Sequence, residues 1–97
     1  MCMPQLRHLV LFKVRPEVAD SEVAEVVAAM QQLGDEPGLR EWRVEMSADV
    51  RKGRVIVENA LFTDEAALAA FRVAPAHRHT SALMANIADW LVGDYSE

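Results

Sequence analysis

The chain has 97 residues, with ten Lys and Arg against fifteen Asp and Glu, and its formal net charge is −5. This length predicts a single domain over residues 1–97, because a second core could not bury enough surface. The acidic balance argues against nucleic-acid binding, and the lack of an apolar run of about 20 residues argues against a membrane span. We therefore expect a cytoplasmic protein that binds neither nucleic acid nor membrane.

The single cysteine, Cys2, excludes an internal disulfide and a thiolate metal cluster. Cys2 lies beside the first methionine, where chains are usually loose, so we interpret it as a thiol without a catalytic role.

Residues 5–15 alternate as a β-strand with two different faces. One face carries Leu6, His8, Val10, Phe12 and Val14. The other face has Leu9 and Leu11 at its centre, whereas a face in contact with water would carry polar residues. We expect helices to cover one face and a second subunit to cover the other, and the 52% hydrophobic content supports this second buried surface.

A helix is predicted next, with Asp20 or Ser21 as its cap and Gly34 as its end. Its apolar residues recur at helical spacing: Val23, Val26, Val27, Met30 and Leu33. The turn at residues 35–38 then leads to a half-exposed strand over residues 40–47.

A loop at residues 51–53 precedes a third strand over residues 55–62. Thr63 is the predicted N-cap of a short helix over residues 66–71, which Pro75 ends. A further helix is expected over residues 80–89, followed by a fourth strand over residues 90–95. The order β-α-β-β-α-(α)-β is that of a ferredoxin-like α+β fold with its helices on one sheet face.

The histidines are the residues with the clearest chemical potential. His77 and His79 follow the predicted helix end, and a fold that brings the first strand to this turn would place His8 and His77 over one pocket. An imidazole titrates near pH 6.5, so His77 is a candidate general base, the alternative being a turn histidine that binds open backbone groups. His8 is either a helper in that pocket or a core histidine held by hydrogen bonds. We expect His79 to face solvent.

Other residues contribute less to the predicted site. His77 and His79 are not at the i, i+4 spacing that places two ligands on one helical face, so no metal or other cofactor is expected. Asn59, isolated in an apolar strand, needs a partner for its amide and is a candidate pocket residue. The aromatic residues Phe12, Trp42 and Phe71 can also line a pocket, although their spacing is equally typical of core positions.

Three short motifs resemble the stress-responsive A/B barrel (Dabb) family. His8-Leu9-Val10-Leu11-Phe12-Lys13 is similar to the first strand of that family, Ala74-Pro75-Ala76-His77 resembles its His-Pro-x-His turn, and Asp94-Tyr95 resembles its closing strand. The resemblance implies a ferredoxin-like protomer that pairs through its open sheet face into a homodimeric α+β barrel. It also implies a pocket between the sheet and the helices.

The resemblance extends to residues of a plant polyketide cyclase in the family, which uses a histidine and a tyrosine. His77 matches that histidine, His8 matches the pocket histidine on the strand, and the tyrosine position is occupied by Phe71. Phe71 lacks the hydroxyl and Ala74 replaces the first histidine of the turn, so the cyclase activity itself is not expected here.

The function that the resemblance implies is that of a homodimer that binds a small hydrophobic or carbonyl compound. As an enzyme, it would use His77, helped by His8, as a base on a carbonyl or polyketide-like substrate, without a cofactor. The first alternative is a non-catalytic stress-response or accessory dimer. A weaker alternative is a haem-binding or monooxygenase-like dimeric barrel.

Overall fold

A four-stranded sheet and three α-helices form the protein in the computed structural model, which describes residues 4–97. The elements follow the predicted order of a ferredoxin-like α+β fold. They are β1 (Leu6–Val14), α1 (Asp20–Gln31), the 3₁₀ helix η1 (Gln32–Asp35), β2 (Leu39–Met46), β3 (Val55–Phe62), α2 (Glu65–Val73), α3 (Pro75–Ala85) and β4 (Ala88–Ser96). Cys2 lies outside the described residues, and its role stays a prediction.

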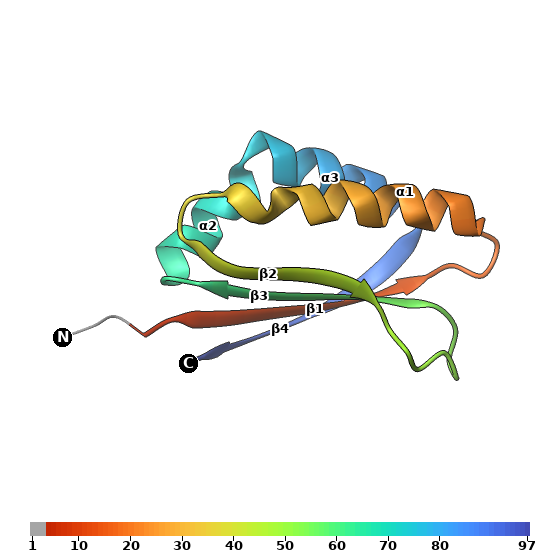
Figure 1. Cartoon of the computed structure of the whole chain (residues 1–97), viewed down its shortest axis with the longest axis horizontal. Helices are drawn as coiled ribbons and strands as arrows, with labels where there is room; N and C mark the ends of the chain where they lie inside the picture. The colour runs from red at the N-terminus through yellow and green to blue at the C-terminus, as the bar shows by residue number, and fades with distance from the viewer. Residues whose placement is uncertain (1–3) are drawn as a thin grey trace.

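The sheet has the strand order β2-β3-β1-β4, and every neighbouring pair is antiparallel. The three helices lie on one face of this sheet, and no part of residues 4–97 covers the other face (Figure 1). The predicted alternation in β1 is confirmed, because Leu6, His8, Val10, Phe12 and Val14 are all buried. None of the helices in the described chain is long and apolar enough to cross a membrane.

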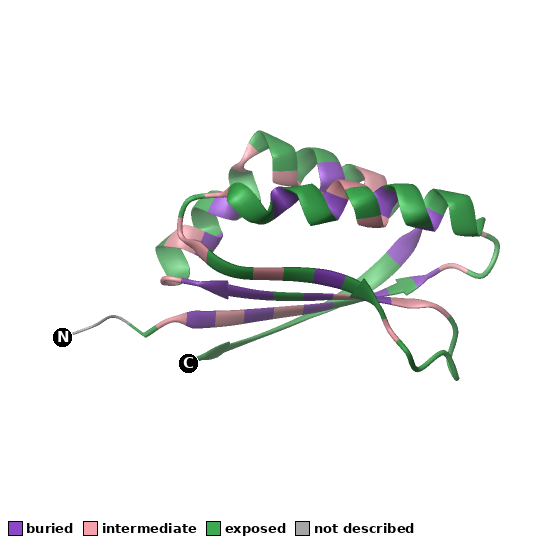
Figure 2. Ribbon diagram, in the orientation of Figure 1, coloured by how far each residue is buried: buried purple, intermediate pink, exposed green. Residues whose placement is uncertain are grey.

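The hydrophobic core lies between the sheet and the helices, and the buried residues form stripes on the elements that meet there (Figure 2). Its larger part contains buried side chains from all four strands, from α1 and α3, and from the link between α3 and β4: Val10, Phe12, Val14, Val23, Val26, Met30, Val44, Ile56, Met84, Ile87 and Ala88. A second part is centred on Phe62 of β3 and Phe71, where α2 packs on the sheet. Burial of this apolar surface is the main force that holds the helices on the sheet.

The ends of α1 differ from the prediction. Its N-cap is Ala19, whose side chain has no polar atom to cap the helix, and the carboxylate of Asp20 accepts a hydrogen bond of 2.6 Å from Arg54. Gly34 does not end the helix either. The chain tightens into η1 at Gln32, and Gly34 packs against the Trp42 ring.

The predictions for the second half of the chain need two corrections. Asp64, not Thr63, caps α2, and its side chain accepts a hydrogen bond of 2.8 Å from the backbone N–H of Ala67. The helix predicted over residues 80–89 lies earlier, over Pro75–Ala85, because proline lacks the N–H that a first turn leaves unpaired, and β4 already begins at Ala88. The histidine segment is therefore the start of α3 and not a loop.

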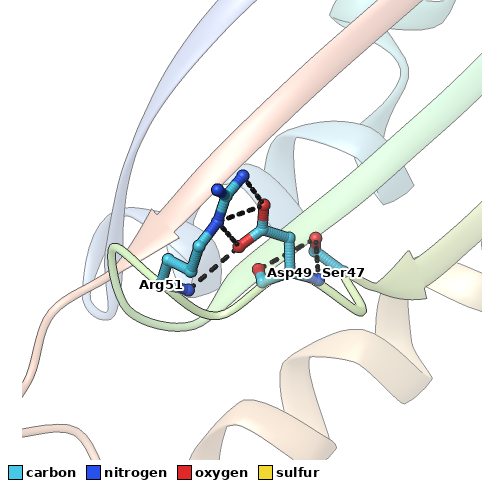
Figure 3. Close-up of polar contacts among 3 residues, drawn as sticks. All are labelled: Ser47, Asp49 and Arg51. Atoms are coloured by element: carbon cyan, nitrogen blue, oxygen red, sulfur yellow. Dashed lines mark hydrogen bonds and ion pairs between the residues drawn. The ribbon is translucent and has the colours of Figure 1, made fainter.

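Two turns are confirmed. Gly38 has a φ of 81°, and a Cβ atom there would lie 2.6 Å from the Cβ of Ala67, so this turn requires glycine. The loop between β2 and β3 is held by its own side chains (Figure 3). There the Asp49 carboxylate accepts hydrogen bonds from the Arg51 backbone and guanidinium, and Ser47 Oγ accepts one from the Asp49 N–H.

Candidate functional site

Strand register brings three ionisable side chains together on the helix-covered face. His8 on β1 lies opposite Asp94 on β4, and the next helix-facing residue of β1, Val10, lies opposite Glu58 on β3. Because side chains of alternate residues share one sheet face, His8, Glu58 and Asp94 project to the same side.

His8 lies between the two carboxylates. Its Nε2 is 3.1 Å from Glu58 Oε2, and its Nδ1 is 2.6 Å from Asp94 Oδ1. The side chains of His8 and Glu58 are only 6% and 4% exposed. Burial alone would lower the pKa of His8, but the hydrogen bonds to Glu58 and Asp94 outweigh it and raise the pKa above 6.5. The arrangement favours an imidazolium that donates from both ring nitrogens.

Arg72, at the end of α2, extends this cluster toward the surface. Its Nη2 lies 3.6 Å from Asp94 Oδ2, so Asp94 is near two cations, His8 on one oxygen and Arg72 on the other. The closer contact is the one to His8. Arg72 is half-exposed and is only loosely paired.

His77, in the first turn of α3, has a different environment. Its Nδ1 lies 3.2 Å from the backbone carbonyl oxygen of Arg72, which can only accept, so Nδ1 carries the hydrogen and Nε2 keeps its lone pair. The ring of Phe71 packs against it at a centroid distance of 4.6 Å. Burial lowers the pKa of His77 below 6.5, outweighing the attraction of Glu58. His77 is therefore a neutral imidazole with a basic nitrogen to spare.

His8 and His77 line one cavity of about 270 Å³ between the sheet and the helices. Most of its wall is apolar, from Val10, Phe12, Met30, Leu33, Met84, Trp90 and Val92. Its polar wall consists of His8, Glu58, Arg72, His77, Thr80 and Ser81. His79, as predicted, is exposed.

The other predicted pocket residues lie in different places. Phe12 lines the cavity, whereas Phe71 lies behind the His77 ring. Trp42 packs on Phe71 and donates a hydrogen bond to the Met30 carbonyl. Asn59 does not reach the cavity: it lies on the uncovered face, where its side-chain oxygen accepts a hydrogen bond of 2.9 Å from Arg7.

Sequence reasoning missed Glu58, Asp94 and Arg72. Glu58 had a usable signal, since it interrupts the alternate row of Ile56 and Ala60 that the core requires to be apolar. A buried carboxylate needs a partner, which is why it is informative there. Asp94 and Arg72 gave no such signal because their importance depends on contacts between distant segments. No group of three His, Cys, Asp or Glu side chains within residues 4–97 is arranged to hold a metal ion.

Comparisons with known proteins agree with this architecture. A dimeric ferredoxin-like protein of unknown function from Thermobifida fusca YX superposes with a TM-score of 0.88 at 21% identity, covering 97% of this chain and 92% of that one. The hydroxynitrile lyase of Passiflora edulis has a TM-score of 0.83 at 16% identity, covering 97% and 94%. SnoaB, a cofactor-independent oxygenase from Streptomyces nogalater, has a TM-score of 0.78 at 18% identity, covering 98% and 94%.

These structural likenesses describe the fold. The curated proteins contain no match to the chain. The model of the stress responsive A/B barrel domain, Dabb, matches residues 6–97. The chain therefore belongs to the Dabb family.

Proposed function

We propose that the protein is a homodimer that binds a small carbonyl compound and transfers a proton on it, with His77 as the general base and no cofactor. The observation that carries this proposal is the neutral His77 ring on the wall of a largely apolar cavity. Its Nδ1 is engaged by the Arg72 carbonyl, so Nε2 is the nitrogen available to a ligand. A positioned general base contributes about 10²–10⁴ in rate.

The proposed proton transfer has two steps, removal of a proton and reprotonation. His77 Nε2 takes a proton from the carbon next to the carbonyl, and the C–H electron pair becomes the C=C bond of an enolate. The negative charge moves to the carbonyl oxygen. Arg72, a cation on the same cavity wall, favours this charge electrostatically, and His8 offsets the negative charge of the neighbouring Glu58 carboxylate. The protonated His77 then exchanges this proton with solvent and delivers a solvent-derived proton to the enolate carbon, which regenerates the base and the carbonyl.

His8 has a supporting role in this proposal. Both of its ring nitrogens are occupied by carboxylates, so it has no lone pair with which to act as a base. Its charge is fixed at the wall by Glu58 and Asp94. The two histidines therefore have different roles, with His77 accepting the proton and His8 offsetting the negative charge of Glu58 and Asp94.

The volume and the lining of the cavity limit the size and polarity of the ligand. Its volume of about 270 Å³ is just below the range of about 300–1,000 Å³ that is usual for pockets of drug-sized ligands. The apolar wall suits a short hydrocarbon chain or a single ring. A haem is larger than such a ligand, so the cavity favours a small ketone over the haem-binding alternative.

The homodimer part of the proposal depends on the uncovered sheet face. Leu11 and Leu91 lie opposite each other there, 50% and 74% exposed, and Val57 flanks Leu11 on the other side. An apolar patch on a sheet face is typical of a surface that another subunit covers. The dimeric relative from Thermobifida fusca supports the same assembly.

The proposed reaction can be tested by deuterium exchange. Neutral β-keto esters and polyketide-like ketones are incubated in D₂O with the wild type and with His77→Gln, and exchange of the carbon-bound proton is followed by NMR. We expect the variant to lower the enzyme-dependent rate by about 10²–10⁴. His79→Gln is the matched control, since His79 is exposed on the same helix. Equal exchange by wild type and His77→Gln would contradict the proposal, and no exchange by the wild type would favour a non-catalytic dimer.

A further inference from the structure

Arg72 lies between two hollows of the molecule. It lines the cavity that contains His77, and it also lines an outer groove between α2 and β4 whose wall includes Leu6, Leu68 and Tyr95. A ligand that enters the cavity from this groove passes the Arg72 side chain. Arg72 is thus the cation that the cavity and the groove share, and we refer to its position as the mouth of the site.

The Arg72 guanidinium has hydrogen-bonding capacity that the protein does not use. A guanidinium carries five N–H donors. Within the described chain, the side chain of Arg72 has the Asp94 contact at 3.6 Å, which is too long for a hydrogen bond. By contrast, Arg7 and Arg54 each make four side-chain hydrogen bonds to the protein. Asp94 also has its closer partner in His8, so it binds Arg72 weakly.

Most other polar groups of the cavity wall are already paired. His8 and Glu58 bind each other, and the Thr80 hydroxyl bonds the backbone carbonyls of Ala76 and His77. Arg72 and the His77 Nε2 remain for a ligand, together with the Ser81 hydroxyl. The buried Glu58 carboxylate repels an anion from its part of the wall, so an anionic group belongs at the mouth.

Arg72 also links the cation to the base. Its backbone carbonyl binds His77 Nδ1, while its side chain extends along the same cavity wall. A ligand whose anionic group lies on Arg72 therefore has the neighbouring carbon atoms near His77. This geometry suits an anionic group within a few bonds of the reacting carbon.

We propose that Arg72 binds a carboxylate of the ligand, and that the substrates are small oxo acids with an apolar body. This inference rests on the proposed function, since it names the substrate class of the same site. The carboxylate occupies the unused guanidinium donors, the apolar body lies against Phe12, Met84 and Trp90, and the carbon next to the carbonyl faces the base. Arg72 is the residue that selects the acid over a neutral ketone.

The test compares phenylpyruvate with its neutral methyl ester. Binding of both is measured by calorimetry to the wild type, Arg72→Met and Arg78→Met. Arg78→Met is the matched control because it removes the same charge from an exposed residue that does not line the cavity. We expect the wild type to bind the acid about tenfold more tightly than the ester, as one charge-assisted contact allows. Arg72→Met should lose this preference without losing affinity for the ester, and Arg78→Met should keep it.

A second measurement needs no variant. Added NaCl should weaken binding of the acid to the wild type and leave the ester unaffected, because salt screens the exposed ion pair. No preference for the acid in the wild type, or a preference that survives in Arg72→Met, would overturn the inference. If neutral ketones still exchange protons through His77 in that case, the proposed function stands and only the substrate class is wrong. Failure of both compounds to bind would overturn the oxo-acid class, while the neutral ketone assay decides the proposed function separately.

Discussion

The helix-covered face of the sheet buries charged side chains, whereas the uncovered face exposes apolar ones. On the covered face, His8 and Glu58 are almost fully buried and directly paired. On the uncovered face, Leu11 and Leu91 lie largely in water. Each arrangement costs free energy in an isolated protomer, since buried charges lose hydration and exposed leucines order water.

The same strands therefore form two different surfaces, the cavity wall and the uncovered face. Successive residues of β1 point alternately into the cavity and onto the open face, so His8 and Leu9 are neighbours in sequence but belong to different sites. We propose a ligand-binding role for the charged cluster and a second subunit on the apolar patch. Changes on one face should therefore affect one property and leave the other intact.

The largest effect is expected from Glu58→Ala, on the covered face. The substitution leaves the buried His8 with Asp94 alone, and removal of one partner from a buried ion pair typically costs about 3 kcal/mol or more. Chemical denaturation should show this loss in the free energy of unfolding. Glu25→Ala, on the exposed part of α1, is the control and should change stability by less than about 0.5 kcal/mol. Equal stabilities for the two variants would contradict the pairing described for His8.

A smaller effect is expected from Leu91→Lys, on the uncovered face. A lysine there would place a charge inside the proposed dimer interface, so the dissociation constant should rise by about tenfold or more. Sedimentation velocity should detect the shift from dimer to a 10.8 kDa protomer. Val73→Lys provides the control, since Val73 is equally exposed but lies in the helix layer. A wild type that sediments as a protomer at every concentration would contradict the proposed homodimer.

The smallest effects are the opposite titrations of the two cavity histidines. The pKa of His8 is raised, so its contribution to stability is present below pH 6.5 and is lost as the pH rises through its folded pKa. The pKa of His77 is lowered, so its contribution is present above pH 6.5 and is lost as the pH falls through its folded pKa. NMR titration of the ring protons should give a midpoint above 6.5 for His8 and below 6.5 for His77. Asp94→Asn should lower the midpoint of His8, and the reverse order of midpoints in the wild type would be inconsistent with the contacts described.

Sequence periodicity was sufficient for the fold and for part of the site. The alternation around His8 predicted two faces for this strand without deciding which one the helices cover, and the family motif pointed to His77, which lines the same cavity as His8. Both histidines could be found because each stands in a recognisable local pattern. Local patterns also located every strand, since β-strands of this length show their two faces directly.

The remaining features depend on contacts that no local pattern records. Asn59 and Glu58 are neighbours in β3, and a polar residue in an apolar strand drew attention to Asn59 although the strand alternation places it on the other face. The roles of Asp94 and Arg72 follow from tertiary contacts between β4, β1 and the end of α2. Helix ends were also displaced, and Asp20 pairs with Arg54 instead of capping its own helix.

The role of His77 as the base is tested most directly by the pH profile of proton exchange on a neutral β-keto ester. If neutral His77 is the base, kcat/KM should rise with pH through a midpoint below 6.5, because burial lowers the pKa of His77. At higher pH it should fall again as His8, whose pKa is raised, loses its proton. The same profile should be absent in His77→Gln. A rise with its midpoint above 6.5, or an unchanged profile in that variant, would show that another group accepts the proton.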